Sequence, residues 1–262
     1  MSESDTGTCG PCGGTGFVIL EEGGAKRARP CGCRRVAHGR PAGAPEFLQA
    51  ARIPRRYHDC EFENFDVYPG PHQLSLQGAK TRAIRLVEEY PLNDRGLLLM
   101  GPPGVGKTHL GVATLRGLAL QKGVACLFCD VQDLLRQLQA TFDRQSGMSE
   151  LDLLQPVLET EVVLLDDLGG RQFSAWVEET LSHIVTTRYN ESRSTIVTTN
   201  YMDEPKEKRD PSLKQRIGPR ICSRLQEMCQ FITLQAEDAR VTIKRADFHR
   251  LPDRGERPRE NA

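Results

Sequence analysis

The sequence predicts an α/β fold in which a parallel sheet flanked by helices follows a small cysteine-rich module. Three observations predict it. An apolar segment, 96–100, leads into a glycine-rich loop and then into a stretch whose apolar residues recur at helical spacing. A second apolar segment, 162–165, ends in two aspartates. Two pairs of closely spaced cysteines stand ahead of both, within residues 1–38. Continuous apolar runs are typical of parallel strands that are buried on both faces.

The composition is that of a globular protein. Of 262 residues, 38% are hydrophobic and 27% are charged, which excludes wholesale disorder. The 35 Lys and Arg residues balance the 35 Asp and Glu residues, which excludes a uniformly basic nucleic-acid binder. Both ends of the chain have a small basic excess, which fits an acidic partner such as DNA and a solvated surface of mixed charge equally well.

No segment has the pattern of a membrane span or an export signal. A transmembrane helix needs about 18 or more apolar residues in succession, and residues 1–20 lack the basic and apolar regions of a secretory signal. We therefore expect a cytoplasmic protein with no membrane partner. In that reducing compartment, clustered cysteines indicate a metal site before they indicate disulfides.

Four cysteines near the amino terminus predict a structural zinc site. Two residues separate Cys9 from Cys12, and one separates Cys31 from Cys33, so the set supplies the four thiolates of a tetrahedral Zn²⁺ site. Because so small a module has almost no apolar core, the metal would stabilise its fold. A redox dithiol and unpaired thiols are the alternatives, but a redox pair is expected beside a βαβ pattern, which this segment lacks.

The segment between the two cysteine pairs, 16–31, predicts a short hairpin. It contains an apolar strand, a Gly-Gly turn and a polar return strand. Farther along, Cys126 and Cys129 repeat the two-residue spacing. They lie within an apolar strand candidate, 124–130, so we expect them to be buried thiols of the core.

The glycine-rich loop matches the Walker A pattern, which binds the phosphates of a nucleotide. Its sequence, GPPGVGKT, stands between the strand and the helix that the motif requires. The glycines let backbone N–H groups point at the phosphates, Lys107 neutralises the β- and γ-phosphate oxygens, and the Thr108 hydroxyl ligates Mg²⁺. The start of the helix adds its dipole. The predicted ATP-binding residues are Gly101, Pro102, Pro103, Gly104, Val105, Gly106, Lys107, Thr108 and His109.

Polar residues at the ends of two strands predict the other half of this site. Asp166 follows the second apolar run, where it would hold Mg²⁺ in the Walker B role. Asp167 comes next, where its carboxylate could polarise the attacking water. The alternative is an acidic turn after a strand. Another strand candidate, 194–200, ends in Asn200, which could contact the γ-phosphate or the water, or could simply end the strand.

The chain resembles the AAA+ ATPases of the DnaC, DnaI and IstB type. The resemblance covers residues 54–245 and rests on an ordered set of motifs: IPRRYHDCEFENF, GPPGVGKTHL, VVLLDDLGG, IVTTRYNESRSTIVTTN and RICSRL. The cysteine-rich start is most similar to that of the zinc-bearing DnaI-type helicase loaders. The resemblance implies a parallel sheet with the Walker A strand in its middle, flanking helices, and little or no separate helical lid.

The resemblance also implies roles for individual residues. Asp166 matches the Walker B acid and Asn200 matches sensor 1. Arg224 matches the arginine finger, which acts on the nucleotide of a neighbouring subunit, and Arg220, one helical turn earlier, is an alternative or a helper. Arg240 aligns with the sensor 2 arginine. Without the resemblance, these arginines are ordinary surface charges.

One residue departs from the family pattern. Many AAA+ proteins have glutamate after the Walker B aspartate, where this chain has Asp167, one methylene shorter. Several loaders of this type also have aspartate there, so the difference does not imply inactivity. Because a shorter carboxylate stands farther from the water, we expect slow hydrolysis of ATP, suited to a switch rather than a motor.

Residues 131–161 predict two helices with a polar break. In the resembling family this insertion lines a central spiral and contacts single-stranded DNA. The basic and aromatic side chains available for that contact are Arg136, Arg144 and Phe142. The alternative is a plain pair of amphipathic helices, with Leu134, Leu135 and Leu138 packed inward.

The chain divides into four predicted parts. These are a zinc-binding module at 1–38, a linker and approach segment at 39–75, the AAA+ ATPase domain at 76–250 and a disordered tail at 251–262. A run rich in Gly and Pro marks the linker, and the tail shows no apolar periodicity.

Three functions compete. The leading hypothesis is a helicase loader, a slow ATPase that assembles into an ATP-bridged oligomer and places a hexameric replicative helicase on single-stranded DNA during replication initiation or restart. The second is an IstB-like transposition helper that acts with a transposase on duplex DNA, although the zinc module argues against it. The third is a zinc-based adaptor that uses ATP only to hold its shape, and it predicts no hydrolysis.

Overall fold

A computed structural model describes most of the chain. The described residues are 17–22, 25–30, 44–92, 95–142, 149–171, 174–204, 210–236 and 238. Within these segments, no helix is long and apolar enough to cross a membrane.

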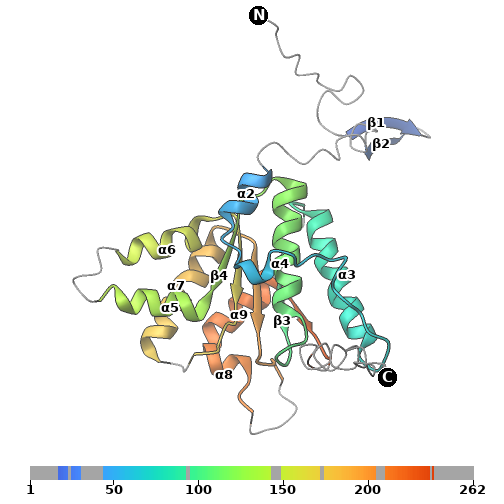
Figure 1. Ribbon diagram of the computed structural model, residues 1–262. Helices are drawn as coiled ribbons and strands as arrows, with labels where there is room; N and C mark the ends of the chain where they lie inside the picture. Colours follow the sequence, from blue (N-terminus) through green and yellow to red (C-terminus); the bar gives the residue numbers. More distant parts are fainter. Residues whose placement is uncertain are drawn as a thin grey trace, which may run out of the picture.

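A five-stranded parallel sheet forms the centre of the fold (Figure 1). Its strands are β3 (Gly96–Met100), β4 (Cys126–Asp130), β5 (Val162–Asp166), β6 (Thr195–Thr199) and β7 (Cys229–Thr233). They are ordered β4-β5-β6-β3-β7, and each pairs in parallel with its neighbour. The predicted α/β fold is confirmed, with the Walker A strand β3 inside the sheet. Because all five strands run the same way, their carboxyl ends meet at one edge.

Helices cover both faces of the sheet, as Figure 1 shows. One face carries α2 (Ala44–Ala50), α3 (Gln73–Glu89), α4 (Lys107–Gly117) and the π-helical turn η2 (Leu118–Lys122). The other face carries α5 (Val131–Ala140), α6 (Glu150–Glu159), α7 (Ala175–Asn190), α8 (Leu213–Ile217) and α9 (Pro219–Met228). The predicted pair of helices with a break between them is therefore confirmed as α5 and α6.

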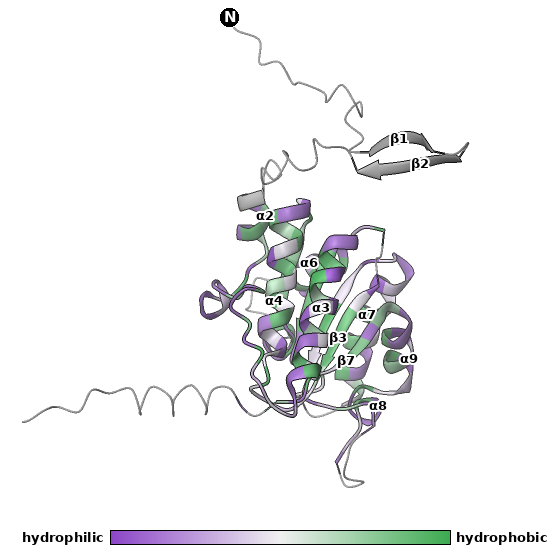
Figure 2. Ribbon diagram, turned by 90° about the vertical axis from the view of Figure 1, so that its right-hand side faces the viewer, coloured by the Kyte–Doolittle hydropathy of each residue, from purple (hydrophilic) through white to green (hydrophobic). Residues whose placement is uncertain are grey.

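Strand residues alternate between two hydrophobic cores, one on each face of the sheet. On β3, Leu97 and Leu99 belong to the core under α3 and α4, whereas Leu98 and Met100 belong to the core under α7 and α9. Successive side chains of a strand point to opposite faces, so a strand buried on both sides must be apolar throughout. Figure 2 shows the hydrophobic residues along the strands and on the helix sides that face them.

The segment ahead of α3 contributes to one of these cores. Ala51, Ile53, Cys60 and Phe65 are buried there, and the Phe128 amide of β4 donates a hydrogen bond to the Ala51 carbonyl at 2.7 Å. A short 3₁₀ helix, η1 (Arg55–Tyr57), lies within this segment. From residue 44 onward, the predicted linker and approach segment is thus packed against the sheet and its helices.

The amino-terminal hairpin is present. Strands β1 (Phe17–Glu22) and β2 (Ala25–Pro30) pair in antiparallel fashion, from Phe17 opposite Pro30 to Glu22 opposite Ala25. The predicted turn and the four predicted zinc ligands, Cys9, Cys12, Cys31 and Cys33, lie outside the described residues, as does the predicted disordered tail.

Candidate functional site

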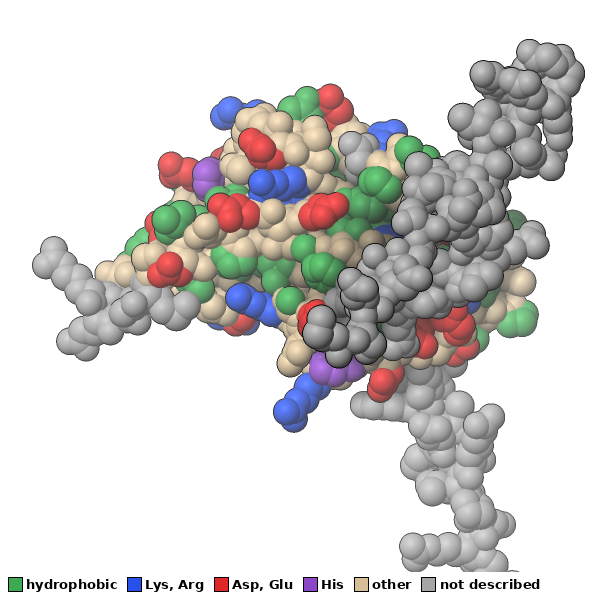
Figure 3. Space-filling model, turned by 90° about the horizontal axis from the view of Figure 1, so that it is seen from above, with side chains coloured by type: hydrophobic (Ala, Val, Ile, Leu, Met, Phe, Trp, Pro, Cys, Tyr) green, Lys and Arg blue, Asp and Glu red, His purple; other side chains and the backbone are tan. Residues whose placement is uncertain are grey.

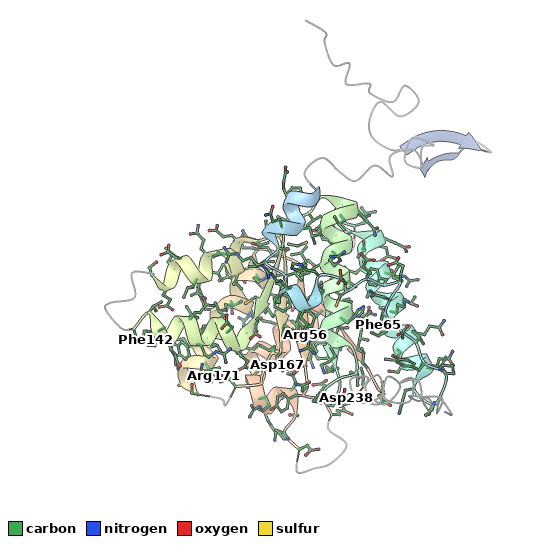
Figure 4. All side chains as sticks on the ribbon, viewed as in Figure 1. Arg56, Phe65, Phe142, Asp167, Arg171 and Asp238 are labelled. Carbon is green, nitrogen blue, oxygen red and sulfur yellow. The ribbon has the colours of Figure 1, made fainter. Side chains whose placement is uncertain are left out.

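The glycine-rich loop lies where β3 ends and α4 begins, at the carboxyl edge of the sheet. Gly106 has φ 95°, and a Cβ atom there would stand 2.6 Å from Cε2 of the buried Phe65. Gly104 has φ 81°, and a Cβ atom there would collide with the Asp238 carboxylate. An L side chain is strained at both φ values and would also be obstructed, so the loop requires glycine at these two positions. Figure 4 labels Phe65 and Asp238.

Lys107 is buried at the start of α4, and its ammonium group donates hydrogen bonds to oxygen atoms of the described residues. It donates to the carbonyls of Gly101 and Pro102 and to Oδ1 of Asn200, each at 2.8 Å. The two carbonyls belong to the phosphate-binding loop itself. The ammonium is therefore held inside the loop, beside the position of an incoming phosphate.

Asp166 ends β5 and accepts two hydroxyl hydrogen bonds. Oδ1 accepts from Thr108 Oγ1 at 2.9 Å and from Thr198 Oγ1 at 2.6 Å. Its side chain is only 7% exposed, and this burial raises the pKa of the carboxyl, while the two hydrogen bonds act in the opposite direction. A hydroxyl and a carboxylate oxygen at the base of a phosphate loop are hard ligands that suit Mg²⁺.

Hydrogen bonds of Asp167 and Asn200 connect the Thr108–Asp166 pair to Lys107. Nδ2 of Asn200 donates to Oδ1 of Asp167 at 2.9 Å, and Oδ1 of the same amide accepts from Lys107. Asp167 adopts φ 57°, a left-handed conformation that aspartate tolerates better than most residues, and its amide donates to Thr198 Oγ1 at 3.0 Å. The carboxylate of Asp167 is thereby aimed across the site rather than along the strand.

These groups surround one cavity of about 470 Å³. Its lining consists of Arg56, Tyr57, Cys60, Pro103, Gly104, Gly106, Lys107, Thr108, His109, Asp166, Asp167, Thr198 and Asn200. A second hollow of about 460 Å³ shares Asn200 with it and has mostly apolar walls. The cavity thus brings together the predicted Walker B pair, sensor 1 and most of the predicted Walker A loop, whereas Gly101, Pro102 and Val105 do not line it.

Four residues of the cavity were not predicted. Thr198 could have been found from the sequence, because it stands two residues before Asn200 and thus on the same side of β6. Arg56, Tyr57 and Cys60 lie in the motif IPRRYHDCEFENF, which supported the family resemblance but gave none of them a role in the site. They come from the segment that the sequence analysis interpreted as an approach to the domain.

Of the three predicted arginines, the two that the structure describes, Arg220 and Arg224, do not line this cavity in their own chain. The guanidinium carbon of Arg224 lies 6.0 Å from the centroid of the Tyr189 ring, and its Nε is buried without a hydrogen-bond partner among the described residues. Arg220 is exposed. Arg240 lies outside the described residues.

The predicted DNA-contacting insertion places one aromatic side chain in solvent. Phe142, just after α5, is 61% exposed and forms an edge-to-face pair with Trp176 of α7, with ring centroids 5.8 Å apart. Arg136 is exposed beside Asp133, and Arg144 lies outside the described residues. The leucines at 134, 135 and 138 are buried, as expected of an amphipathic helix.

The remaining cysteine pair is confirmed as buried thiols. Cys126 belongs to the core beneath α4 and Cys129 to the core beneath α5, so they lie on opposite faces of β4 and cannot share a metal ion. Burial raises the pKa of each thiol to about 12. Among the residues that the structure describes, no cluster of three or more His, Cys, Asp and Glu side chains could hold a metal.

Comparison with known proteins identifies a family and individual proteins to which this chain is similar. A family model described as "IstB-like ATP binding protein" matches residues 46–246. The replicative helicase loader DnaC of Buchnera aphidicola subsp. Schizaphis graminum is 28% identical over 178 residues, which make up 68% of this chain and 68% of that loader.

Two solved structures are similar in fold. The crystal structure of the DnaC helicase loader superimposes with a TM-score of 0.59 and 34% identity, covering 70% of this chain and all of that one. The crystal structure of DnaI gives a TM-score of 0.55 and 25% identity, covering 71% of this chain and 94% of that one.

Proposed function

Because the chain belongs to the family of IstB-like ATP binding proteins and has the AAA+ fold, we propose that it is an ATP-dependent loader of a hexameric replicative helicase. The observation that carries the proposal is the chain of contacts from Lys107 through Asn200 to Asp167, beside the Thr108–Asp166 pair. It links the position of the γ-phosphate to the position of the attacking water. We infer the helicase as the partner from relatives that are named as helicase loaders.

Each residue of the site would have a separate role in ATP hydrolysis. Lys107 would exchange its two carbonyl partners for phosphate oxygens when ATP enters. Thr108 and Asp166 would hold Mg²⁺, which neutralises charge on the phosphates when it is bound. Asp167 would accept a hydrogen bond from the attacking water, while Asn200 fixes the direction of its carboxylate.

Hydrolysis by this arrangement is expected to be slow. The Asp167 carboxylate is short and is already committed to Asn200, so it reaches the water poorly. We expect a turnover below about 1 per second, the low end of common enzyme values. A steady-state phosphate-release assay measures it, and a much faster turnover would exclude a switch-like ATPase.

We also propose that the end of α5 contacts single-stranded DNA. Phe142 offers an exposed ring supported by Trp176, and the Arg171 side chain lies near this helix, since its Nη2 donates to Gln139 at 2.6 Å. Figure 4 labels Phe142 and Arg171 on the same side of the molecule. An aromatic ring that stacks on a base is worth about 1–3 kcal/mol, so Phe142→Ala should weaken oligonucleotide binding by about fivefold to a hundredfold. Fluorescence anisotropy with a labelled oligonucleotide tests this.

Another face of the molecule is less suited to DNA. Figure 3 shows acidic and basic side chains intermingled over the uncovered part of the face seen from above, with no broad basic area there. A nucleic-acid surface requires clustered positive charge, so we do not assign DNA binding to this face.

The amino-terminal module is proposed to bind one Zn²⁺ through Cys9, Cys12, Cys31 and Cys33. The observed register supports this, because Phe17 and Pro30 pair at one end of the hairpin, and both cysteine pairs are attached to the chain at that same end. Metal analysis of the purified protein should give one zinc per chain, and none after the four cysteines are changed to serine.

The decisive experiment is capture of the purified replicative helicase of the same organism. The tagged full chain should retain the helicase in a nucleotide-dependent way, with different yields in ATP and in ADP. Lys107→Ala should abolish the nucleotide dependence, and Lys214→Ala, an exposed lysine of α8 away from the site, should not. Failure to retain the helicase under any nucleotide condition would contradict the proposal.

A transposition helper is the second candidate, since the family model carries the IstB name. It predicts retention of a transposase and preference for duplex over single-stranded DNA. The same capture experiment, with both partners offered together, separates the two functions.

A further inference from the structure

Arg56 brings a second positive charge into the nucleotide cavity. It lines the cavity together with Lys107, Asp166 and Asp167, and its side chain is exposed. It makes no hydrogen bond or ion pair with the described residues, although two carboxylates line the same cavity. The guanidinium of Arg56 is therefore available to bind an anionic ligand that attracts it more strongly than the two carboxylates of the cavity do.

The backbone that carries Arg56 is held firmly in place. On one side, the Phe128 amide bonds to the Ala51 carbonyl, and on the other, Arg116 of α4 donates to the His58 carbonyl and to the Glu61 carboxylate. The guanidinium is therefore presented from a fixed base, which reduces the entropy lost when it binds.

The position of η1 places Arg56 on the β4 side of the cavity. Tyr57 packs against Phe128 of β4, with ring centroids 6.1 Å apart, and β4 is the direct neighbour of β5, which ends in Asp166. Phe65, later in the same segment, reaches the opposite flank of the loop at Gly106. Figure 4 labels Arg56 and Asp167 in the same part of the molecule. In the proposed site the γ-phosphate would lie beside Thr108 and Asp166, which would hold Mg²⁺ and which line the same cavity as Arg56.

The charges of the cavity show what Arg56 contributes. Lys107 and Arg56 balance Asp166 and Asp167, so the four groups together are neutral. Without Arg56 the walls would be net negative toward MgATP, which is itself an anion. ATP differs from ADP by the γ-phosphate, which adds negative charge that Arg56 would offset.

We propose that Arg56 binds the γ-phosphate of ATP within its own chain and makes the site prefer ATP to ADP. The proposal rests on the nucleotide site described under Proposed function. It adds a cation from the same chain to the one expected from a neighbouring subunit, since Arg224 lies elsewhere in its own chain.

The test compares Arg56→Ala with Arg55→Ala in the full chain. Arg55 is the adjacent arginine of η1, is exposed and does not line the cavity, so it is a matched control for charge and for local structure. Dissociation constants for MgADP and for a non-hydrolysable MgATP analogue are measured by titration calorimetry. A charge-assisted hydrogen bond is worth about 1.5–3 kcal/mol, so Arg56→Ala should weaken the ATP analogue about tenfold to a hundredfold.

Binding of ADP by Arg56→Ala should stay within about twofold of wild type, well below the tenfold change that 1.4 kcal/mol would produce. Arg55→Ala should alter neither nucleotide, and Arg56→Lys should recover part of the ATP preference. Thermal unfolding without nucleotide checks that the variants are folded.

Two results would overturn the inference. Equal loss of ATP and ADP binding in Arg56→Ala would show a contact with the shared part of the nucleotide, and an unchanged preference for ATP would show a solvated side chain. If wild-type protein binds no nucleotide at all, the proposed function fails instead, which is a distinguishable outcome.

Discussion

Arg188 is fully buried between α6, α7 and β6, yet no carboxylate pairs with it among the described residues. Its five N–H groups all find oxygen acceptors: the Thr195 hydroxyl and the carbonyls of Val157, Thr160, Glu161 and Ser194. Burial lowers the pKa of the guanidinium to about 10, which still leaves it charged at neutral pH. Arginine is suited to this place because its planar fork can donate to several carbonyls at once.

We expect Arg188→Met to be severely destabilising. Methionine fills similar space but leaves four carbonyls without their donor, and breaking a buried charged network of this kind costs about 3–5 kcal/mol. Urea denaturation monitored by circular dichroism measures the free energy of unfolding. Arg85→Ala, which removes an exposed arginine of α3 paired with Glu89, should cost less than about 1 kcal/mol. A comparable loss in both variants would argue against the network.

Asp166 predicts a pH-dependent stability of the protein without metal and nucleotide. Because burial raises the pKa of this carboxyl, its protonated form favours the fold, and that contribution is lost as the pH rises through the raised pKa. Asp166→Asn should therefore raise the melting temperature at pH 7 by a few degrees, with a gain that shrinks as the pH is lowered.

Asp152 is the control for this measurement. Its side chain is exposed, and hydrogen bonds from Ser149 lower the pKa of its carboxyl, so Asp152→Asn should not raise the melting temperature. Differential scanning fluorimetry across the pH range measures both variants. A uniform gain at every pH for Asp166→Asn would contradict the linkage.

The junction of β3 and α4 shows how an element depends on a neighbour that is distant in sequence. Gly106 must adopt a positive φ to end the loop, and the ring of Phe65 closes the space beside it. The buried aromatic thereby supports the loop from the side away from the phosphates.

Gly106→Ala should reduce nucleotide binding by about tenfold or more, because left-handed backbone costs an alanine roughly 1–2 kcal/mol before any collision with Phe65. Gly78→Ala in α3 is the matched control. Its Cβ would meet only the flexible end of Arg82, so it should leave nucleotide binding unchanged and stabilise the helix by about 0.5–1 kcal/mol.

Titration with fluorescent nucleotide measures binding by both variants. The double variant Gly106→Ala with Phe65→Leu separates the effect of the collision with the Phe65 ring from the effect of the positive φ angle. If the double variant binds like wild type, the collision and not the φ angle was the cause.

At the scale of the whole molecule, the question is whether the nucleotide site is completed by a second subunit. The cavity contains the groups that we propose to bind ATP and position water, whereas Arg224 lies on α9 and does not line it. A site that needs Arg224 is therefore complete only between two subunits, which explains why self-assembly and hydrolysis would be coupled.

We expect Lys107→Ala and Arg224→Ala to be inactive separately and active when mixed. In a mixed oligomer, an intact nucleotide site of one variant can meet the intact arginine of the other, and an arginine finger contributes about 10³-fold or more to the rate. Phosphate release is measured across mixing ratios. Lys107→Ala mixed with Asp167→Asn should stay inactive, because both changes impair the nucleotide site itself. Wild-type activity of Arg224→Ala alone would contradict the role, and the same experiment with Arg220→Ala tests the alternative residue.

Features with a continuous sequence pattern were predicted more accurately than features whose residues are scattered along the chain. Strands at 96–100 and 162–166 were predicted almost to the residue, because a strand buried on both faces must be continuously apolar. The packing of residues 44–65 was not predicted, since its buried side chains are scattered among turns and polar residues. Arg56 was not predicted, although it lies in the motif IPRRYHDCEFENF, because that motif indicated only the family and the sequence does not show whether an arginine faces solvent or a ligand.

The sequence by itself determined the fold class, the phosphate loop and the acidic pair, because each is encoded in neighbouring residues whose spacing has a direct physical meaning. Only the tertiary structure decided that Thr198 bonds to Asp166, that Asn200 joins Lys107 to Asp167, and that η1 reaches the same cavity. These contacts depend on the order of strands in the sheet and on the path of the chain across α4. That order arises from the packing of two whole cores, which no local pattern of residues encodes.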